Sequence, residues 1–483
     1  MSVKNLWKPA ALLLFIMIAA ISQMACPTEA AEPAAMPLPS DFDWAPLLKV
    51  IRTGPGKYEV DKTADDLRKM MSEGKTVTQY FVDPVKGKDS NSGLTQELAL
   101  KTMQAAANKK SGDISEIIVI PSKSRMIWGT DATVNGFANS AIIYTIDGKD
   151  VIFCKGAKPT WAAAGDGTYT TSGPVGESNT SIVMDWSPAA RSASPDGGGL
   201  GYERTASAAD VAGKPGTFFH DTKTGLVTVC PFDKRTLVGD EYVTPPVATN
   251  LNCWSMSTPS SATAGRFYWV RNCHWVGGLN PLGMNNNSLA KARSSLVFDH
   301  CGMWAGSVGG NAFAAVGPND IYTFDCIGGY SHADLWNVHG NGLGSGRIFH
   351  VRPRCTVRNG YGNTGRDNVE TGHEDSRGIT VMPTYANSDG RVYGYIDRSR
   401  SLVFGGKIGP SLRTDDFCAS VNSGGISVVD LYEVGLVPSK GPYTLTADGT
   451  KTGSGASIRC HGMDITNFTK RGANIRGSLK SEP

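Results

Sequence analysis

The chain has 483 residues, of which 57 are glycine, 10 are cysteine and 19% are charged, and its formal net charge is +3. A charge so close to neutral argues against a general nucleic-acid-binding protein. From residue 130 onward no apolar i, i+3, i+4, i+7 pattern persists long enough for a convincing helix, which argues against a helical protein.

The N-terminus has the pattern of a secretory signal peptide. Lys4 and Lys8 precede a short apolar run, residues 11–21, and small residues follow it. The run is shorter than the roughly 20 apolar residues that cross a bilayer. We therefore expect residues 1–25 to be a signal and the protein to be secreted, periplasmic or on the bacterial cell surface. Lipidation of Cys26 remains an alternative.

Three further segments come before the main domain or after it. Residues 26–45 form a Pro- and Ala-rich linker, and residues 46–78 form a lead-in with a short predicted helix at 65–72. The main domain is expected over residues 79–475 and a tail over 476–483. At about 400 residues, the main domain is long for a single globular core and typical of a repetitive architecture.

Four segments repeat one pattern of alternating apolar residues, a polar or turn position and a cysteine. The cysteines are Cys273, Cys301, Cys326 and Cys355, at separations of 28, 25 and 29 residues. Strand-like units with a period in the twenties predict a solenoid, and a parallel β-helix fits better than a propeller or a leucine-rich repeat. Cysteines at one position of successive turns point the same way, so we expect buried, reduced thiols rather than disulfides.

The stretch from Tyr80 to Ser122 resembles the opening of many pectate-lyase-like right-handed parallel β-helix proteins. The matching residues are Tyr80, Val82, Gly87, Asp89, Asn91, Gly93, Lys101 and Thr102. The resemblance implies an all-β fold, a right-handed parallel β-helix with a short N-terminal capping helix, here residues 102–108. Oxygens of Asp89 and Asn91 could hold Ca²⁺, but turn formation explains these residues better.

Residues 160–246 differ from the repeats and are rich in Gly, Ser, Ala and Pro. We expect them to form loop excursions from the solenoid. One piece, "PGTFFHDTKTGLVTVCPFD", predicts a β-hairpin whose two strands are joined by "DTKTG".

The segment from Gly328 to Val381 concentrates His, acidic and Arg side chains more than any other part of the chain. We expect four of these residues to be catalytic: His332, Asp334, His373 and Glu374. Substrate binding is expected from Arg366, Arg377, Trp336, His339 and Asp375. His332, His350 and His373 could stand on neighbouring turns, since their separations approximate one repeat. The spacing matches no recognised metal-ligand pattern.

Two reactions suit such a cluster on a glycan-binding solenoid. A polysaccharide lyase needs a base and a cation that neutralises a uronate carboxylate. A glycoside hydrolase needs two carboxyl groups, here Asp334 with Glu374 or Asp375. Residues 347–413 contain ten Arg and one Lys against six acidic residues, which slightly favours a lyase acting on an anionic polysaccharide.

A third possibility is a non-catalytic glycan-binding, adhesin or cell-envelope protein built on the same rod, in which tryptophans would stack on sugars. A spike-like protein of this kind could form a trimer. No nucleic-acid partner and no stable membrane span are expected.

Overall fold

The structure is a computed structural model that describes residues 34–478 except for 176–181, 195–196, 246–250, 258–263, 287–292, 307–309, 341–343, 357–367, 417, 449–454 and 473. The predicted signal peptide and Arg366 therefore lie outside the described residues. In the described ranges, none of the helices has the length and apolar content that crossing a membrane requires.

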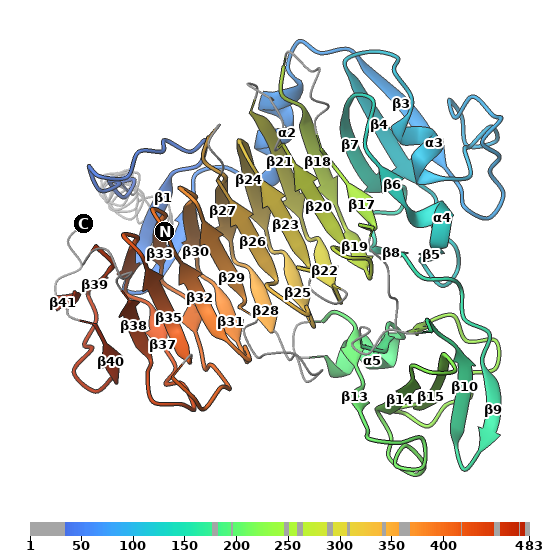
Figure 1. Cartoon of the computed structure of the whole chain (residues 1–483). Helices are drawn as coiled ribbons and strands as arrows, with labels where there is room; N and C mark the ends of the chain where they lie inside the picture. The colour runs from blue at the N-terminus through green and yellow to red at the C-terminus, as the bar shows by residue number, and fades with distance from the viewer. Residues whose placement is uncertain are drawn as a thin grey trace, which may run out of the picture.

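Three long parallel sheets form the body of the molecule, and the chain passes through them in a fixed order (Figure 1). Sheet I contains, from its N-terminal end, β3 (Val77–Val82), β4 (Ile114–Val119), β7 (Ser140–Thr145), β18 (Phe267–Arg271), β21 (Ser294–Asp299), β24 (Asn319–Phe324), β27 (Arg347–Val351), β30 (Arg377–Val381), β33 (Arg400–Phe404), β36 (Val428–Tyr432), β39 (Ser457–His461) and β41 (Ile475–Ser478). Sheet II contains β5 (Met126–Trp128), β8 (Val151–Cys154), β19 (Cys273–Val276), β22 (Gly302–Trp304), β25 (Ile327–Gly329), β28 (Arg354–Thr356), β31 (Thr384–Ala386), β34 (Lys407–Ile408) and β37 (Gly435–Leu436). Sheet III contains β6 (Val134–Asn135), β17 (Trp254–Ser255), β20 (Leu282–Asn285), β23 (Phe313–Val316), β26 (Trp336–His339), β29 (Glu370–His373), β32 (Arg391–Tyr395), β35 (Ala419–Gly424), β38 (Leu445–Asp448) and β40 (Lys470–Arg471).

From β4 to β38 each turn of the solenoid contributes one strand to each sheet. β18, β19 and β20 form one rung, and β21 then pairs in parallel with β18 to begin the next. The prediction of a parallel β-helix is therefore confirmed. Its right-handedness stays a prediction. Since rungs are about 4.8 Å apart, the 12 strands of sheet I span about 53 Å.

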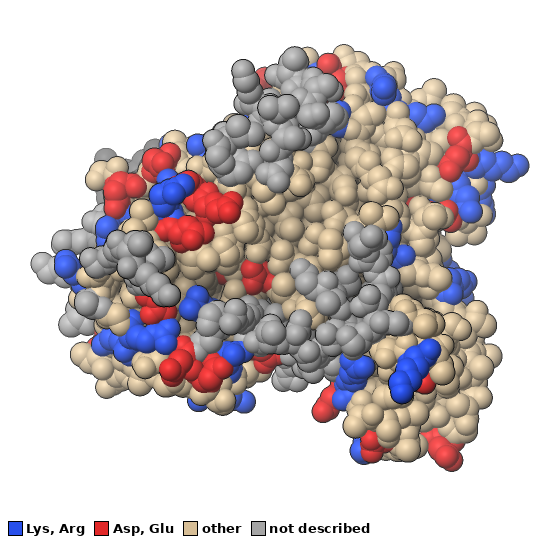
Figure 2. All heavy atoms as spheres, in the orientation of Figure 1, with Lys and Arg blue, Asp and Glu red and all other residues tan. Residues whose placement is uncertain are grey.

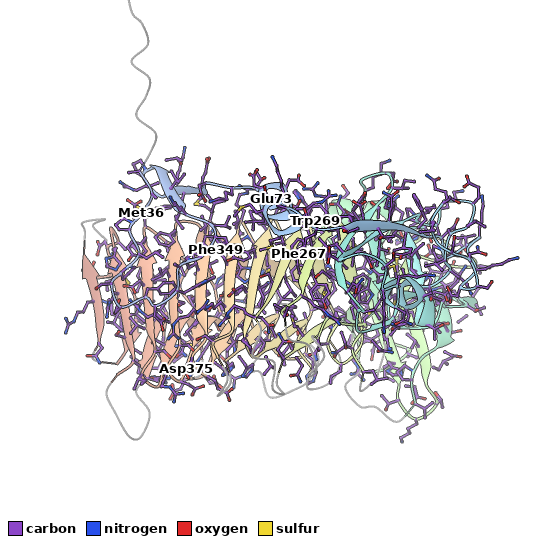
Figure 3. All side chains as sticks on the ribbon, turned by 90° about the horizontal axis from the view of Figure 1, so that it is seen from above. Met36, Glu73, Phe267, Trp269, Phe349 and Asp375 are labelled. Atoms are coloured by element: carbon purple, nitrogen blue, oxygen red, sulfur yellow. The ribbon has the colours of Figure 1, made fainter. Side chains whose placement is uncertain are left out.

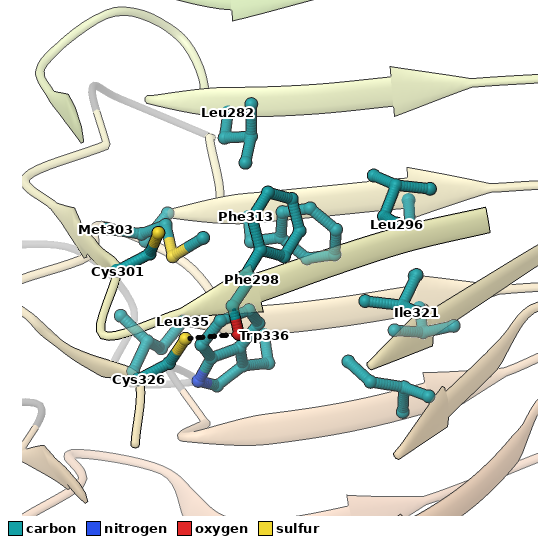
Figure 4. Close-up of a cluster of buried hydrophobic side chains, with 14 of the residues drawn as sticks. Leu282, Leu296, Phe298, Cys301, Met303, Phe313, Ile321, Cys326, Leu335 and Trp336 are labelled. Carbon is teal, nitrogen blue, oxygen red and sulfur yellow. Dashed lines mark hydrogen bonds between the residues drawn. The ribbon is translucent and has the colours of Figure 1, made fainter. Parts of the chain in front are cut away.

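The predicted cysteine stack is confirmed for three residues and wrong in register for the fourth. Strand pairing places Cys273, Cys301 and Cys326 opposite one another. Cys355 pairs instead with Gly328, two residues further along the strand, because Pro353 takes the position that the cysteines occupy in earlier rungs. The described cysteines are all free thiols. Figure 4 shows Cys301 and Cys326 pointing into the apolar core among Phe, Leu and Met side chains.

The motif shared with pectate-lyase-like proteins forms the start of a short helix. Asp89 Oδ1 accepts hydrogen bonds from the backbone N–H groups of Lys101 and Thr102, both at 2.9 Å. Thr102 then caps helix α3 (Met103–Ala107). Three residues of α3 join the core cluster. The helix is present where it was expected, and its role as a cap of the solenoid stays a prediction. These bonds support turn formation as the role of Asp89.

The N-terminal segment, residues 34–73, lies along the outer face of sheet I (Figure 3). It contains the antiparallel pair β1 (Val50–Gly54) and β2 (Lys57–Val60), followed by α2 (Ala64–Ser72), which agrees with the helix expected at 65–72. Trp44 packs on Tyr322 and Phe349, with ring centroids 6.5 Å and 6.4 Å apart. This face of sheet I is therefore a second apolar core rather than a free surface.

Ion pairs between distant residues border this second core. Asp43 pairs with Arg377, and Asp41 Oδ1 lies 2.6 Å from a guanidinium nitrogen of Arg400. Arg400 also pairs with buried Asp430. The basic excess over residues 347–413 is thus partly neutralised by acidic groups of the N-terminal segment.

Residues 162–244 leave the solenoid and pack on the early rungs of sheet II. This insertion contains β9 (Ala162–Gly165), β10 (Thr168–Ser172), β11 (Met184–Asp185), α5 (Pro188–Ala193), β12 (Leu200–Gly201), β13 (Glu203–Arg204), β14 (Thr217–Asp221), β15 (Leu226–Cys230) and β16 (Val243–Thr244). β14 and β15 form the predicted hairpin. Trp186 of the insertion packs on Trp304 of sheet II, with centroids 5.6 Å apart. Neither the apolar cluster that contains Trp186 and Trp304 nor the second apolar core on sheet I includes a residue of sheet III.

Candidate functional site

The corner between sheets II and III is held by a ladder of amide and carboxylate side chains. In each rung a side-chain oxygen accepts the backbone N–H of the equivalent residue in the next rung, at distances from 2.8 Å to 3.3 Å. The side chains that accept these bonds are Asn252, Asn280, Asn311, Asp334 and Asn368. Asp334 is thus one member of a repeated structural position.

Asp334 is buried and accepts further side-chain hydrogen bonds. Asn337 Nδ2 donates to its Oδ2 at 2.6 Å, and Asn368 Nδ2 donates to its Oδ1 at 2.8 Å. Burial raises the pKa of Asp334, and these donors oppose the rise. The contacts assign Asp334 a role in joining rungs.

A second polar group lies at the other end of the same strands, where sheet III turns into sheet I. The rings of His339 and His373 stack with centroids 4.4 Å apart and planes 5° from parallel. Glu374 Oε2 lies 3.8 Å from His339 Nδ1, and Asp397 Oδ2 lies 3.9 Å from His373 Nδ1. Burial and the neighbouring His339 lower the pKa of His373 to about 4, and burial also lowers the pKa of His339. Both rings are therefore neutral near pH 7, which permits them to stack.

The structure does not bring the four predicted catalytic residues together. Asp334 lies before β26, whereas Glu374 and Asp375 follow β29, which pairs with β26 in parallel. The strand pairing therefore gives no support to pairing Asp334 with Glu374 or Asp375 as the two carboxyl groups of a glycosidase, and that pairing stays a prediction. His332 is buried at the same corner as Asp334, and burial lowers its pKa.

Three other predicted residues have different surroundings from those expected. Trp336 is 0% exposed in the solenoid core and donates to Cys355 Sγ at 3.2 Å, so its prediction as a sugar-binding residue is wrong. Arg377 pairs with Asp43, and Arg398 Nε donates to Asp375 at 2.7 Å.

His350 does not stand beside His332 and His373. It lies on β27 of sheet I, 0% exposed in the solenoid core. Strand pairing instead places His373 opposite His339.

The sequence analysis missed Asp397, although a signal for it was present. "HEDSR" at residues 373–377 and "IDRSR" at 396–400 are one rung apart, because the strand pairs on either side have the same register. This register aligns Glu374 with Asp397, and the backbone N–H of Glu374 donates to Asp397 Oδ2 at 3.3 Å. The two carboxylates therefore occupy equivalent positions in neighbouring rungs, which are about 4.8 Å apart.

The outer face of sheet III also contains a row of polar side chains, which we call the polar row: Asn337, Thr371, Asn422 and Thr446, with Gly394 between Thr371 and Asn422. They point outward because their neighbours along each strand, such as Trp336 and Val338, belong to the core. All four side chains are at most 5% exposed. Asn337 Oδ1 and Asn422 Nδ2 are buried without a hydrogen-bond partner among the described residues, whereas the Thr371 side chain hydrogen-bonds Asp334.

Leaving a buried polar atom without a partner costs about 1 to 3 kcal/mol. Asn337 Oδ1 and Asn422 Nδ2 are therefore candidates for hydrogen bonds to ordered water or to a bound molecule. In Figure 2 the charged atoms gather over the C-terminal rungs, and the middle of this face is largely uncharged. No group of three or more His, Cys, Asp or Glu suited to a metal ion occurs among the residues that the structure describes.

Comparison with known proteins gives only distant structural likenesses. No protein-family model and no curated protein matches the sequence. A structure described as XylC in complex with xylose has 10% identity and a TM-score of 0.41, over 82% of this chain and 70% of the other. A glycoside hydrolase has 9% identity and a TM-score of 0.39, over 83% and 95% of the two chains. The GH136 lacto-N-biosidase from Eubacterium ramulus has 8% identity and a TM-score of 0.26, over 86% and 69%. The fold assignment rests on the strand pairing described above and not on these likenesses.

Proposed function

We propose that this protein is exported and that it binds and hydrolyses a polysaccharide on the outer face of sheet III. The observation that carries the proposal is the polar row, since it places polar side chains at one position of successive rungs along the solenoid axis. A polysaccharide presents hydroxyl groups repeatedly along its length, and each can donate and accept hydrogen bonds. The outer faces of sheet I and of early sheet II, in contrast, are occupied by the N-terminal segment and the insertion.

For hydrolysis, we propose Glu374 and Asp397 as the carboxyl pair. In this scheme one carboxyl group protonates the oxygen of the leaving sugar, and the other activates a water molecule or attacks the sugar directly. The neutral His339 and His373 rings lie against these carboxylates and would position them.

Among the described residues, the surroundings of Arg377 and Arg398 give the lyase alternative no support. A lyase needs a cationic group that is available to the uronate carboxylate. Arg377 is engaged by Asp43, and Arg398 is engaged by Asp375. We therefore favour hydrolysis.

Replacing either proposed carboxyl group should abolish cleavage. We expect Glu374→Gln and Asp397→Asn each to lower the rate at least 100-fold, since proton transfer by a positioned side chain contributes 10²- to 10⁴-fold. The measurement is the release of reducing ends from a panel of neutral and uronate-containing polysaccharides, with ultraviolet absorbance recorded in parallel. Asp325→Asn, on the opposite corner of the solenoid, is the control and should retain the wild-type rate.

Absorbing unsaturated products would show a lyase and contradict the proposal. Binding of a polysaccharide without cleavage, by the wild type and by both variants, would identify a non-catalytic glycan-binding protein.

Gly394 tests the polar row independently of cleavage. A Cβ atom built on it has its nearest heavy atom 4.0 Å away, so Gly394→Ser fits the fold. The added side chain points outward into the row, and we expect affinity for the bound polysaccharide to fall at least fivefold while the thermal unfolding midpoint is unchanged. Gly54→Ser on β1 is the matched control, since a Cβ atom built on Gly54 has its nearest heavy atom 3.9 Å away. Unchanged affinity in Gly394→Ser would place the glycan elsewhere.

A further inference from the structure

The seam between the insertion and the solenoid contains a cleft of about 520 Å³. The insertion contributes Trp186, Arg191 and Tyr242 to its lining, and the segment before β5 contributes Lys123. A cleft of this volume falls in the range of small-molecule sites, about 300 to 1,000 Å³. It is separate from sheet III, because its lining residues come from the first rungs of sheets I and II and from the insertion.

One buried group in this lining lacks a partner. Trp186 is 2% exposed, and its indole Nε1 is buried without a hydrogen-bond partner in the part of the chain that the structure describes. Contacts with Trp304 and His274 fix the ring, with centroids 5.6 Å and 5.8 Å away. Since an indole N–H is a donor only, the missing partner is a hydrogen-bond acceptor.

The cationic side chains of the lining are held in place from behind. Arg125 Nη1 lies 2.8 Å from Asp147 Oδ2. Arg191 pairs with Asp150, whose Oδ2 lies 3.4 Å from His274 Nε2. These pairs fix the guanidinium groups and take up part of their charge.

The described lining residues include three cationic side chains and no carboxylate. Lys123 is exposed at the rim. Hydroxyl groups of Ser124, Ser192 and Tyr242 and the apolar surface of Ile152 and Pro188 complete the lining. This combination suits a small ligand that has a carboxylate, several hydroxyl groups and an apolar face.

We propose that this cleft is a second ligand site, which binds a sugar acid of one or two rings. Its carboxylate lies toward Lys123 and Arg191, and one of its oxygens accepts the Trp186 N–H. The site is independent of the proposed hydrolysis on sheet III.

The test is calorimetric titration of the full chain with D-galacturonate and with its disaccharide. We expect binding with a Kd in the millimolar range or tighter. Lys123→Gln should weaken it at least fivefold, because the exposed ammonium group is lost. Trp186→Phe should weaken it about three- to tenfold, because it removes the N–H while an aromatic ring remains in the packed position. Lys69→Gln, on α2, is the matched control and should bind like the wild type.

Two further probes separate the parts of the proposal. If inorganic sulfate binds as tightly as the sugar acid, the cleft is only an anion site. If D-galactose binds as tightly as the sugar acid, the carboxylate charge has no role in binding. Either result overturns the proposal. So does an absence of binding, or binding that neither variant weakens. Asn422→Ala in the polar row should leave this titration unchanged, so failure here and failure of the sheet III site can be told apart.

Discussion

As the pH rises from 4.5 to 8, the unfolding free energy of a Glu370→Gln variant should increase by about 3 kcal/mol relative to that of the wild type. Glu370 is 0% exposed in the solenoid core, where it accepts hydrogen bonds from Tyr385 at 2.8 Å and Tyr395 at 2.7 Å. Burial raises its pKa from 4.5 to about 7, although the tyrosine hydroxyls oppose the rise. A shift of about 2.5 pKa units corresponds to about 3 kcal/mol.

The sign follows from the raised pKa in the folded state. Below pH 4.5 Glu370 is protonated in both states and has no effect on the pH dependence. As the pH rises toward 7, the carboxyl group ionises in the unfolded chain but resists ionisation in the core, so the wild type loses stability. Glutamine has no such titration.

Urea unfolding of both proteins at pH 4.5, 6 and 8 measures the effect. The difference between the two proteins isolates Glu370 from other titrating groups, such as buried His350, whose Nε2 lies 3.7 Å from Glu370 Oε2. Burial lowers the pKa of His350 to about 3, which destabilises the fold only in acid. A difference that stays constant across the three pH values would show that Glu370 ionises normally in the folded protein.

The repeated rungs could be predicted from the sequence because their determinants are local. Apolar alternation recurs in successive rungs and a cysteine occupies one position in three of them, and the strands of sheets I and II follow these repeats. Cys355 shows the limit of this reasoning. Counting from cysteine to cysteine assumes an unchanged turn, whereas the strand pairing displaces this residue by two positions.

The covering of sheet I could not be predicted in the same way. Asp43 and Arg377 are separated by 334 residues, and no local pattern relates them. The basic excess over residues 347–413 was therefore interpreted without its acidic partners.

The predicted active site could not be located from the sequence either, since clustering along the sequence does not distinguish the two ends of a strand. His332 and Asp334 lie at one corner of sheet III, and His373 and Glu374 lie at the other.

Asp334→Ala should lower the unfolding free energy by about 3 kcal/mol, whereas Asp334→Asn should lower it by less than about 1 kcal/mol. The alanine variant leaves three donors without an acceptor: the buried side-chain amide of Asn337, and the half-buried backbone N–H and side-chain amide of Asn368. Asparagine occupies the other positions of this ladder and keeps the acceptor that joins the rungs. Its new Nδ2 group would face Asn337 Nδ2, but the Asn337 amide can turn to present Oδ1, which is unpartnered in the wild type. Denaturant unfolding gives both differences.

The same pair of variants separates the structural role of Asp334 from the catalytic role expected from the sequence. An amide can join rungs but cannot transfer the protons that glycoside hydrolysis requires. If Asp334 only joins rungs, Asp334→Asn cleaves polysaccharide within about threefold of the wild-type rate, whereas catalytic use of the carboxyl group predicts a loss of about 100-fold or more. A stable but inactive Asp334→Asn protein would therefore move the active site from the Glu374–Asp397 corner to the corner of sheets II and III. A destabilised one would show that the ladder depends on the carboxylate charge itself.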